Sequence, residues 1–123
     1  MGCDIHYLVE VREGSRWSPT SRQPVIYRNY HLFADLAGVR QRDPMGHPIA
    51  RPRGVPEDAS QSFLVMLDKV GSDAHTPTWL TLSELRRAAW HDWSGGERLA
   101  AEVADVALGH AEADVRLVFF FDN

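Results

Sequence analysis

The sequence has very little cysteine and no long hydrophobic segment. Cys3 is the single cysteine, which excludes an internal disulfide and agrees with a reducing compartment. No apolar run approaches the roughly 18 residues that a membrane-spanning helix needs. The N-terminus has neither the basic start nor the apolar stretch of a secretory signal peptide. These absences predict a cytoplasmic protein with no membrane partner.

An excess of positive charge is also lacking. The formal net charge is −4, so the composition gives no overall signal for nucleic-acid binding. A Gly-rich phosphate loop, a serine nucleophile elbow and a Cys-x-x-Cys pair are all absent. Arginines nevertheless gather in one central stretch, at positions 40, 42, 51 and 53. A local site for an anion is therefore compatible with an acidic protein.

Strand-like segments occupy both ends of the chain. Residues 3–11 alternate, with an apolar set on one side that starts at Cys3, so we expect this thiol to face the core and to be unreactive. Residues 115–121 are almost wholly apolar, as in a central strand that is buried on both faces. A turn at residues 13–15 predicts a short return strand from Arg16 to Ser18.

Helical patterns fill the chain between these strands. Asn29 and Gly38 are a suitable N-cap and C-terminal stop for a short helix, and Thr81–Glu84 reads as a capping box. The expected helices cover about 30–38, 57–70, 82–89 and 95–110. At 123 residues the chain predicts one domain, 1–123, of the α+β class. We expect a small antiparallel sheet with adjacent, central terminal strands and three to four helices packed on it, although the sequence does not itself exclude parallel pairing.

Two Asp-x-His patterns and a C-terminal acid are the candidates for a metal site. Asp4 and His6 lie two residues apart on the first strand, so their side chains share a face. Asp73 and His75 repeat the pattern, and antiparallel pairing of the terminal strands would bring Asp122 close to the first pair. Mixed imidazole and carboxylate ligands suit Zn, Mn or Fe. Asp4, His6, Asp73 and His75 are accordingly the catalytic candidates, and with Asp122 the ligands, of a metal-dependent phosphoester or nucleotide hydrolase.

The same five residues also allow an interpretation without metal. They can form a hydrogen-bonded network, in which Asp73 caps a turn and His75 lies in a loop. Of the other histidines, His91 and His110 are assigned to structure, whereas His31 and His47 are left open.

Four arginines and one tryptophan are the candidates for binding an anionic ligand. The planar guanidinium group takes phosphate or carboxylate oxygens two at a time. Trp79, which follows His75 closely, offers a ring for stacking. Solvated loop arginines or internal ion pairs are the alternative. The candidate ligand-binding residues are Arg28, Arg40, Arg51, Arg53 and Trp79.

Several motifs together resemble those of a family of small proteins encoded by bacteriophages and prophages. They are Met1–His6, Arg28–Tyr30, Leu36–Arg40, Pro52–Pro56, Ser72–His75 and Phe120–Asn123. The likeness runs over the whole chain, and the first six residues are its most specific part. The resemblance implies a phage origin and the cytoplasm of a bacterial host, and it supplies no reaction.

Three functions are compatible with these patterns. The first is an accessory protein with an Asp/His/Arg pocket for a nucleotide-like anion, which it hydrolyses if a metal binds. The second is a non-catalytic binder that sequesters a host nucleotide signal or blocks a host protein, as in anti-defence. The third is a structural or assembly protein. The oligomeric state and the identity of the ligand cannot be read from the sequence.

Overall fold

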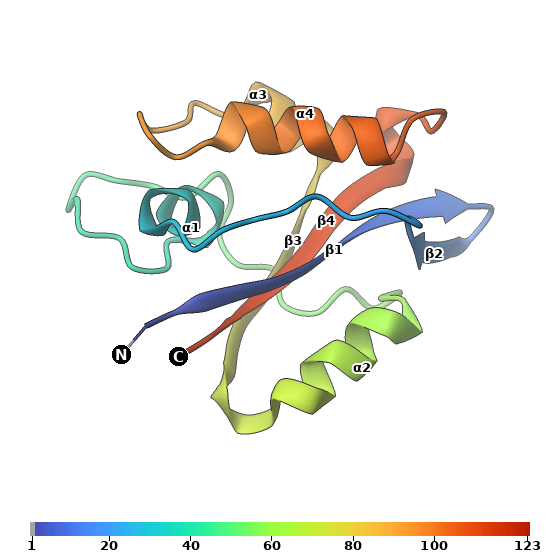
Figure 1. The fold of residues 1–123 in the computed structure, drawn as a ribbon, viewed down its shortest axis with the longest axis horizontal. Helices are drawn as coiled ribbons and strands as arrows, with labels where there is room; N and C mark the ends of the chain where they lie inside the picture. Colours follow the sequence, from blue (N-terminus) through green and yellow to red (C-terminus); the bar gives the residue numbers. More distant parts are fainter. Residues whose placement is uncertain (1) are drawn as a thin grey trace.

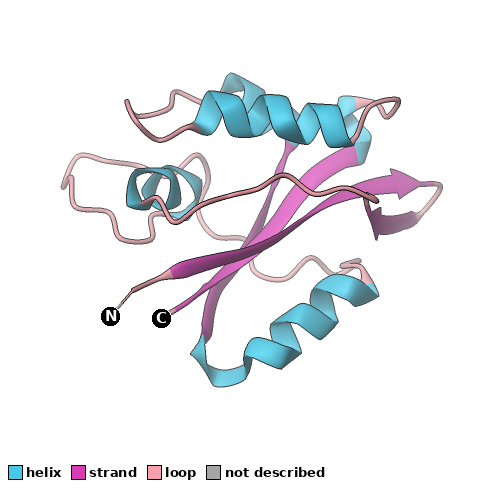
Figure 2. Cartoon of the chain, viewed as in Figure 1, coloured by secondary structure: helices cyan, strands magenta, loops and turns pink. Residues whose placement is uncertain are grey.

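A four-stranded antiparallel sheet is the centre of the fold, which a computed structural model describes for residues 2–123. The strand order is β2-β1-β4-β3 (Figures 1 and 2). The strands are β1 (Asp4–Glu13), β2 (Arg16–Pro19), β3 (Ala74–Thr81) and β4 (Val115–Asp122). The structure therefore confirms the α+β class and the expected hairpin between the first two strands.

The two terminal strands lie side by side at the middle of the sheet. Asp4 is opposite Asp122 and Val11 is opposite Val115, so β1 and β4 pair antiparallel along almost their whole length. All residues of β4 from Val115 to Phe121 are buried. This agrees with the apolar run in the sequence, because a strand covered on both faces has no polar side to present. Both ends of the chain consequently meet at one edge of the molecule (Figure 1).

Helices cover both faces of the sheet unequally. One face carries α1 (Tyr30–Ala37), α3 (Leu82–Arg87) and α4 (Gly96–Val106), whereas α2 (Gln61–Val70) covers the other face alone (Figure 1). Two short 3₁₀ turns, Gly71–Asp73 and Glu112–Asp114, precede β3 and β4. None of the helices within residues 2–123 is long and apolar enough to cross a membrane.

Side-chain alternation divides the apolar residues into two cores. Val9, Leu117 and Phe119 pack with the three helices of the larger core. Val118 and Phe120 pack with Phe63 of α2 in the smaller one. Cys3 belongs to the larger core, and burial raises the pKa of its thiol, as expected for an unreactive cysteine.

The ends of α1 and the start of α3 follow the expected capping residues, whereas α2 begins later than expected, at Gln61, and α3 ends earlier, at Arg87. The Asn29 side chain accepts hydrogen bonds at the start of α1, and Thr81 and Glu84 form the expected capping box of α3. The α4 helix differs, because its N-cap is Gly95 in the left-handed conformation, and the preceding Ser94 hydroxyl accepts from the Gly96 N–H at 3.1 Å. It also ends at Val106, short of the expected His110. The first residue of α4 is glycine, and a Cβ there would come closer than 3.0 Å to the Trp90 indole, so a larger residue would displace that ring.

Candidate functional site

The end of the sheet where the chain termini meet brings three of the predicted metal ligands together. The His6 Nε2 atom is hydrogen-bonded to the Asp122 carboxylate, and its ring stacks on Phe120 with centroids 4.9 Å apart. Asp4 is the strand partner of Asp122 but pairs with Arg28, whose Nε donates a 2.9 Å hydrogen bond. The predicted ligand-binding role of Arg28 therefore competes with an internal ion pair.

The other two predicted ligands do not join this group. His75 stacks on Phe121, which points to the opposite face of the sheet from Phe120 because neighbouring residues in a strand alternate. The Nε2 atom of His75 contacts the Asn123 side chain at 3.1 Å. Asp73 lies in the 3₁₀ turn before β3 and is exposed. The expectation that His6 and His75 face one pocket is wrong.

The described chain offers no alternative cluster of this kind. Within residues 2–123, no group of three or more His, Cys, Asp or Glu side chains is placed to hold a metal ion. At the end of the sheet, His6 is thus hydrogen-bonded to Asp122 and Asp4 pairs with Arg28, and a metal bound there stays a prediction.

Two predicted ligand-binding residues, Arg53 and Trp79, are in contact, but Arg53 also forms an internal ion pair with Glu84. The Arg53 guanidinium lies 4.5 Å from the Trp79 ring centroid and donates to Glu84 at 2.8 Å. The hydrogen bond from Arg53 is the largest effect that lowers the pKa of Glu84, to about 2. This carboxylate therefore stays ionised and keeps the arginine occupied.

The surrounding pocket alternates arginine and tryptophan side chains. Arg116 lies 4.0 Å from the Trp17 ring centroid and 6.0 Å from that of Trp79, and Arg12 lies 5.4 Å from Trp17. The pocket holds about 640 Å³. Its three guanidiniums already pair with carboxylates: Arg12 with Asp114, Arg53 with Glu84, and Arg116 with Glu10 and Asp58. Since each of these guanidiniums already has a carboxylate partner, the pocket is a poor anion site.

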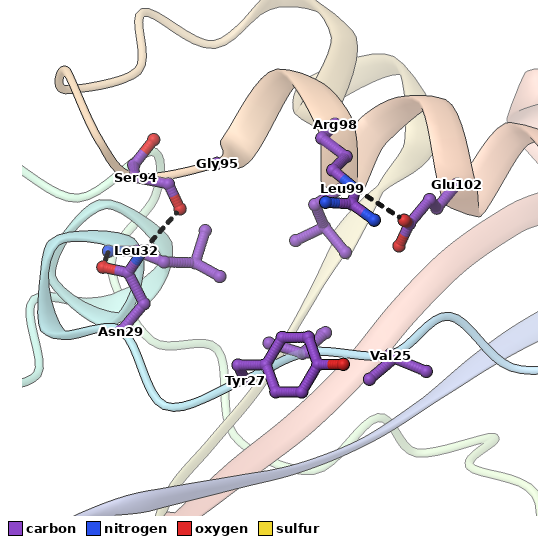
Figure 3. A pocket seen from close by; sticks show the side chains of 10 residues that line it. Val25, Tyr27, Asn29, Leu32, Ser94, Gly95, Arg98, Leu99 and Glu102 are labelled. Carbon is purple, nitrogen blue, oxygen red and sulfur yellow. Dashed lines mark hydrogen bonds and ion pairs between the residues drawn. The ribbon is translucent and has the colours of Figure 1, made fainter.

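A second pocket, shown in Figure 3, is mainly apolar. Tyr27 and Leu99 contribute to its wall, and it holds about 200 Å³. Its charged residues, Arg98 and Glu102, pair with each other at 3.0 Å (Figure 3). This pocket therefore also lacks an arginine that is available to an anion.

A third pocket, named here the histidine–arginine pocket, combines imidazole and guanidinium groups. It holds about 400 Å³. The first turns of α1, the loop after this helix and the loop between α3 and α4 supply its wall. The lining residues are Tyr30, His31, Ala34, Arg40, Gln41, Arg42, Asp43 and His91.

Local structure positions the elements of the histidine–arginine pocket. The Asn29 side chain caps α1 by accepting from the His31 N–H at 3.0 Å, and it donates to the Trp93 carbonyl at 2.9 Å. One residue thus fastens the start of α1 to the loop that carries His91. Gly38 ends α1 in the left-handed conformation, and Arg40 has a φ of 59°, which is uncommon for a residue with a side chain.

A buried carboxylate orients the His91 ring. Asp35 is 3% exposed, accepts the His91 backbone N–H at 2.9 Å and hydrogen-bonds its Nδ1 atom. Since an ionised carboxylate can only accept, Nδ1 carries the proton in this pair. The hydrogen bond to Asp35 is the largest effect that raises the pKa of His91, and the charges of Asp35, Asp43 and Asp92 add to it. The other ring nitrogen, Nε2, makes no hydrogen bond with residues 2–123.

Two arginines, Arg40 and Arg42, line the histidine–arginine pocket. Arg42 is exposed and forms no ion pair with any residue that the structure describes. Arg40 lies over the Tyr30 ring, 4.9 Å from its centroid. The wall also carries one carboxylate, that of Asp43, and His91 pairs with Asp35 behind it. Arg51, the remaining predicted arginine, is exposed and does not line the pocket.

The Asp35–His91 pair was not predicted from the sequence, and His91 was expected to have a structural role. One signal was present in the sequence. Asp35 is surrounded in the sequence by the apolar residues Leu32–Ala34, Leu36 and Ala37 of the same helix. A carboxylate at a buried helix position needs a partner. The identity of that partner, 56 residues further along the chain, is a property of the fold alone.

No protein-family model, curated protein or solved structure matches the chain.

Proposed function

We propose that this protein binds a small phosphate-bearing, nucleotide-like ligand in the histidine–arginine pocket. The observation that carries the proposal is that Arg42, which forms no ion pair with any of residues 2–123, lines one cavity with Arg40 and His91. Elsewhere in the described chain, the predicted ligand-binding residues Arg28 and Arg53 are held by carboxylates.

The chemistry of this wall suits a phosphate group. A guanidinium binds two phosphate oxygens in a planar fork, and hydrogen bonds of this charged kind are stronger than neutral ones. A cavity of about 400 Å³ lies within the usual range for small-molecule sites.

The resemblance to phage-encoded proteins supports a biological use for such binding. A phage accessory protein of the bacterial cytoplasm would sequester a nucleotide signal of its host. Blocking a host protein is the alternative function, and it requires no small ligand. The two differ in whether the isolated protein binds a nucleotide.

Calorimetric titration with AMP, and with adenosine as the uncharged control, tests the proposal. We expect AMP to bind and adenosine to bind at least tenfold more weakly. Arg42→Gln should weaken AMP binding roughly tenfold or more, because one hydrogen bond to a charged group contributes about 1.5–3 kcal/mol. Arg51→Gln removes an exposed arginine that lies outside the pocket and should leave the affinity unchanged.

Two results would contradict the proposal. The first is equal binding of AMP and adenosine, which would show that phosphate is not recognised. The second is an equal loss of affinity in Arg42→Gln and Arg51→Gln, which would show only a general effect of net charge. Absence of binding by both AMP and inorganic phosphate would overturn the proposal and favour the function of blocking a host protein.

A further inference from the structure

We infer that the histidine–arginine pocket cleaves short ribonucleotide phosphodiesters by general acid–base catalysis, with His91 as the base and His31 as the acid. The inference rests on the proposed function, because the same arginines would hold the phosphate. It goes further by assigning a reaction, a substrate class and two catalytic residues.

Asp35 prepares His91 for the role of a base. Its carboxylate binds both the backbone N–H and the ring Nδ1 of His91, so it fixes the position of the ring and its tautomer together. The lone pair of a neutral His91 is then on Nε2, which is the nitrogen without a protein partner in the described chain. A buried carboxylate that orients an imidazole in this way also stabilises the imidazolium formed when the ring takes a proton.

His31 supplies the second imidazole in the same cavity. It lies in the first turn of α1, is exposed and lines the pocket together with His91. Its ring meets the edge of Trp93 with centroids 6.3 Å apart. Two histidines in one pocket provide the base and the acid that a proton transfer from nucleophile to leaving group requires.

The reaction balances without any further reactant. The Nε2 atom of neutral His91 takes the proton of the ribose 2′-hydroxyl, whose oxygen forms a bond to phosphorus. The bond between phosphorus and the 5′-oxygen breaks, and protonated His31 gives its proton to that oxygen. The products are a 2′,3′-cyclic phosphate and a free 5′-hydroxyl. Arg42, together with Arg40 on the same pocket wall, would stabilise the charge that develops on the phosphoryl oxygens.

Two features favour a short ribonucleotide as the substrate. A ribose carries its own nucleophile next to the phosphate, and such an intramolecular attack needs only proton transfer and charge stabilisation. Trp93 is 85% exposed beside His31, so it offers a face on which a base can stack. The net charge of −4 disfavours long RNA and leaves a dinucleotide as the natural probe.

Cleavage of the dinucleotide UpA, followed by chromatography, tests the inference. We expect 2′,3′-cyclic UMP from UpA and no product from its 2′-deoxy analogue. His91→Asn keeps a donor for Asp35 and lacks Nε2, so it should fold normally and lose about 100-fold or more in kcat. His47→Ala changes an exposed histidine outside this pocket and should retain full activity.

The role of His31 has its own readout. His31→Ala should slow cleavage of UpA about 100-fold, since the 5′-oxygen needs a proton to leave. It should have little effect on uridine 3′-(4-nitrophenyl phosphate), whose leaving group needs none. Asp35→Asn should move the acid limb of the kcat/KM profile to lower pH, as expected for a residue that positions His91 and raises its pKa.

The outcomes separate this inference from the proposed function. If AMP binds through Arg42 but UpA is not cleaved, the binding function stands and the catalytic inference is overturned. Cleavage that persists unchanged in His91→Asn would identify a contaminating nuclease and would overturn it equally. Equal loss on both uridine substrates in His31→Ala would remove the assignment of the acid.

Discussion

Two charged residues of the smaller core, Glu10 and Arg116, are almost completely buried. The Arg116 Nε atom donates to Glu10 at 2.8 Å, and the second Glu10 oxygen accepts the Ser60 N–H at 3.0 Å. Arg116 also donates to Asp58 at 2.8 Å and lies against the Trp17 ring. Each buried charge thus has several partners, which offsets the cost of removing it from water.

Removal of one partner should be costly at this position. Arg116→Met leaves the Glu10 carboxylate buried without its counter-charge, and we expect a loss of about 3–5 kcal/mol in the free energy of unfolding. Urea denaturation of the variant and the parent protein measures the difference. The double variant Glu10→Leu with Arg116→Met removes both charges and should recover most of the loss.

The Arg98–Glu102 pair on the surface of α4 is the matched control. Arg98 is 81% exposed, so Arg98→Met should cost less than about 0.5 kcal/mol. A loss in Arg116→Met no larger than this would show that the buried network does not stabilise the fold.

At the level of elements, the start of α3 connects a capping box to the loop before α2. Thr81 and Glu84 cap each other, and the Glu84 carboxylate also binds Arg53. The pKa of Glu84 falls from an ordinary value of 4.5 to about 2, with the hydrogen bond from Arg53 as the main cause. The folded state therefore favours the ionised form of this carboxyl.

Acid should weaken the protein through this element. Because the pKa of Glu84 is lower in the folded state, its contribution to stability is complete above pH 4.5 and is lost as the pH falls towards about 2. Glu84→Gln should flatten the fall in the urea midpoint over this pH window. The exposed Glu97, changed to Gln, serves as control and should leave the slope unaltered. A slope that stays the same in Glu84→Gln would contradict this account.

Most of the elements could be predicted because their signals are local. The Asn29 cap, the Gly38 stop and the Thr81–Glu84 box act within one helical turn, and the apolar β4 run identifies a central strand. The second Asp-x-His pattern misled for a local reason too. Asp73 belongs to a 3₁₀ turn and His75 to β3, so the two residues do not share one face of a strand as Asp4 and His6 do.

The candidate site was less predictable because its contacts span the sequence. Arg40 was expected to bind a ligand and does line the chosen pocket. That Arg28 and Arg53 pair with carboxylates depends on residues 24 and 31 positions away, which no motif records. A ligand-binding role for any of these arginines stays a prediction.

Over the whole molecule, the histidine–arginine pocket depends on how α1 is held against the loop before α4. Two residues supply the hydrogen bonds of this connection: Asn29 donates to the Trp93 and Ser94 carbonyls, and Asp35 binds the backbone N–H and the ring of His91. Both residues belong to α1 or its cap, and both bind the same loop. Movement of α1 away from this loop would therefore open the pocket and separate the base from the residue that orients it.

Global stability should consequently fall as the pH rises through the titration of His91. The pKa of His91 is raised in the folded protein, chiefly by Asp35 with further effects of Asp43 and Asp92, so the stabilising charge is complete below about pH 6.5. It is lost as the pH passes the raised value, although neutral His91 still donates from Nδ1. Thermal unfolding from roughly pH 6 to 9 should show a declining Tm. The His91→Asn variant, which cannot titrate, should lose this decline, whereas the control His47→Asn should keep it, because His91 joins the loop to a buried carboxylate of α1. Parallel curves of Tm against pH for the parent protein and both variants would show that this pair does not hold the two elements together.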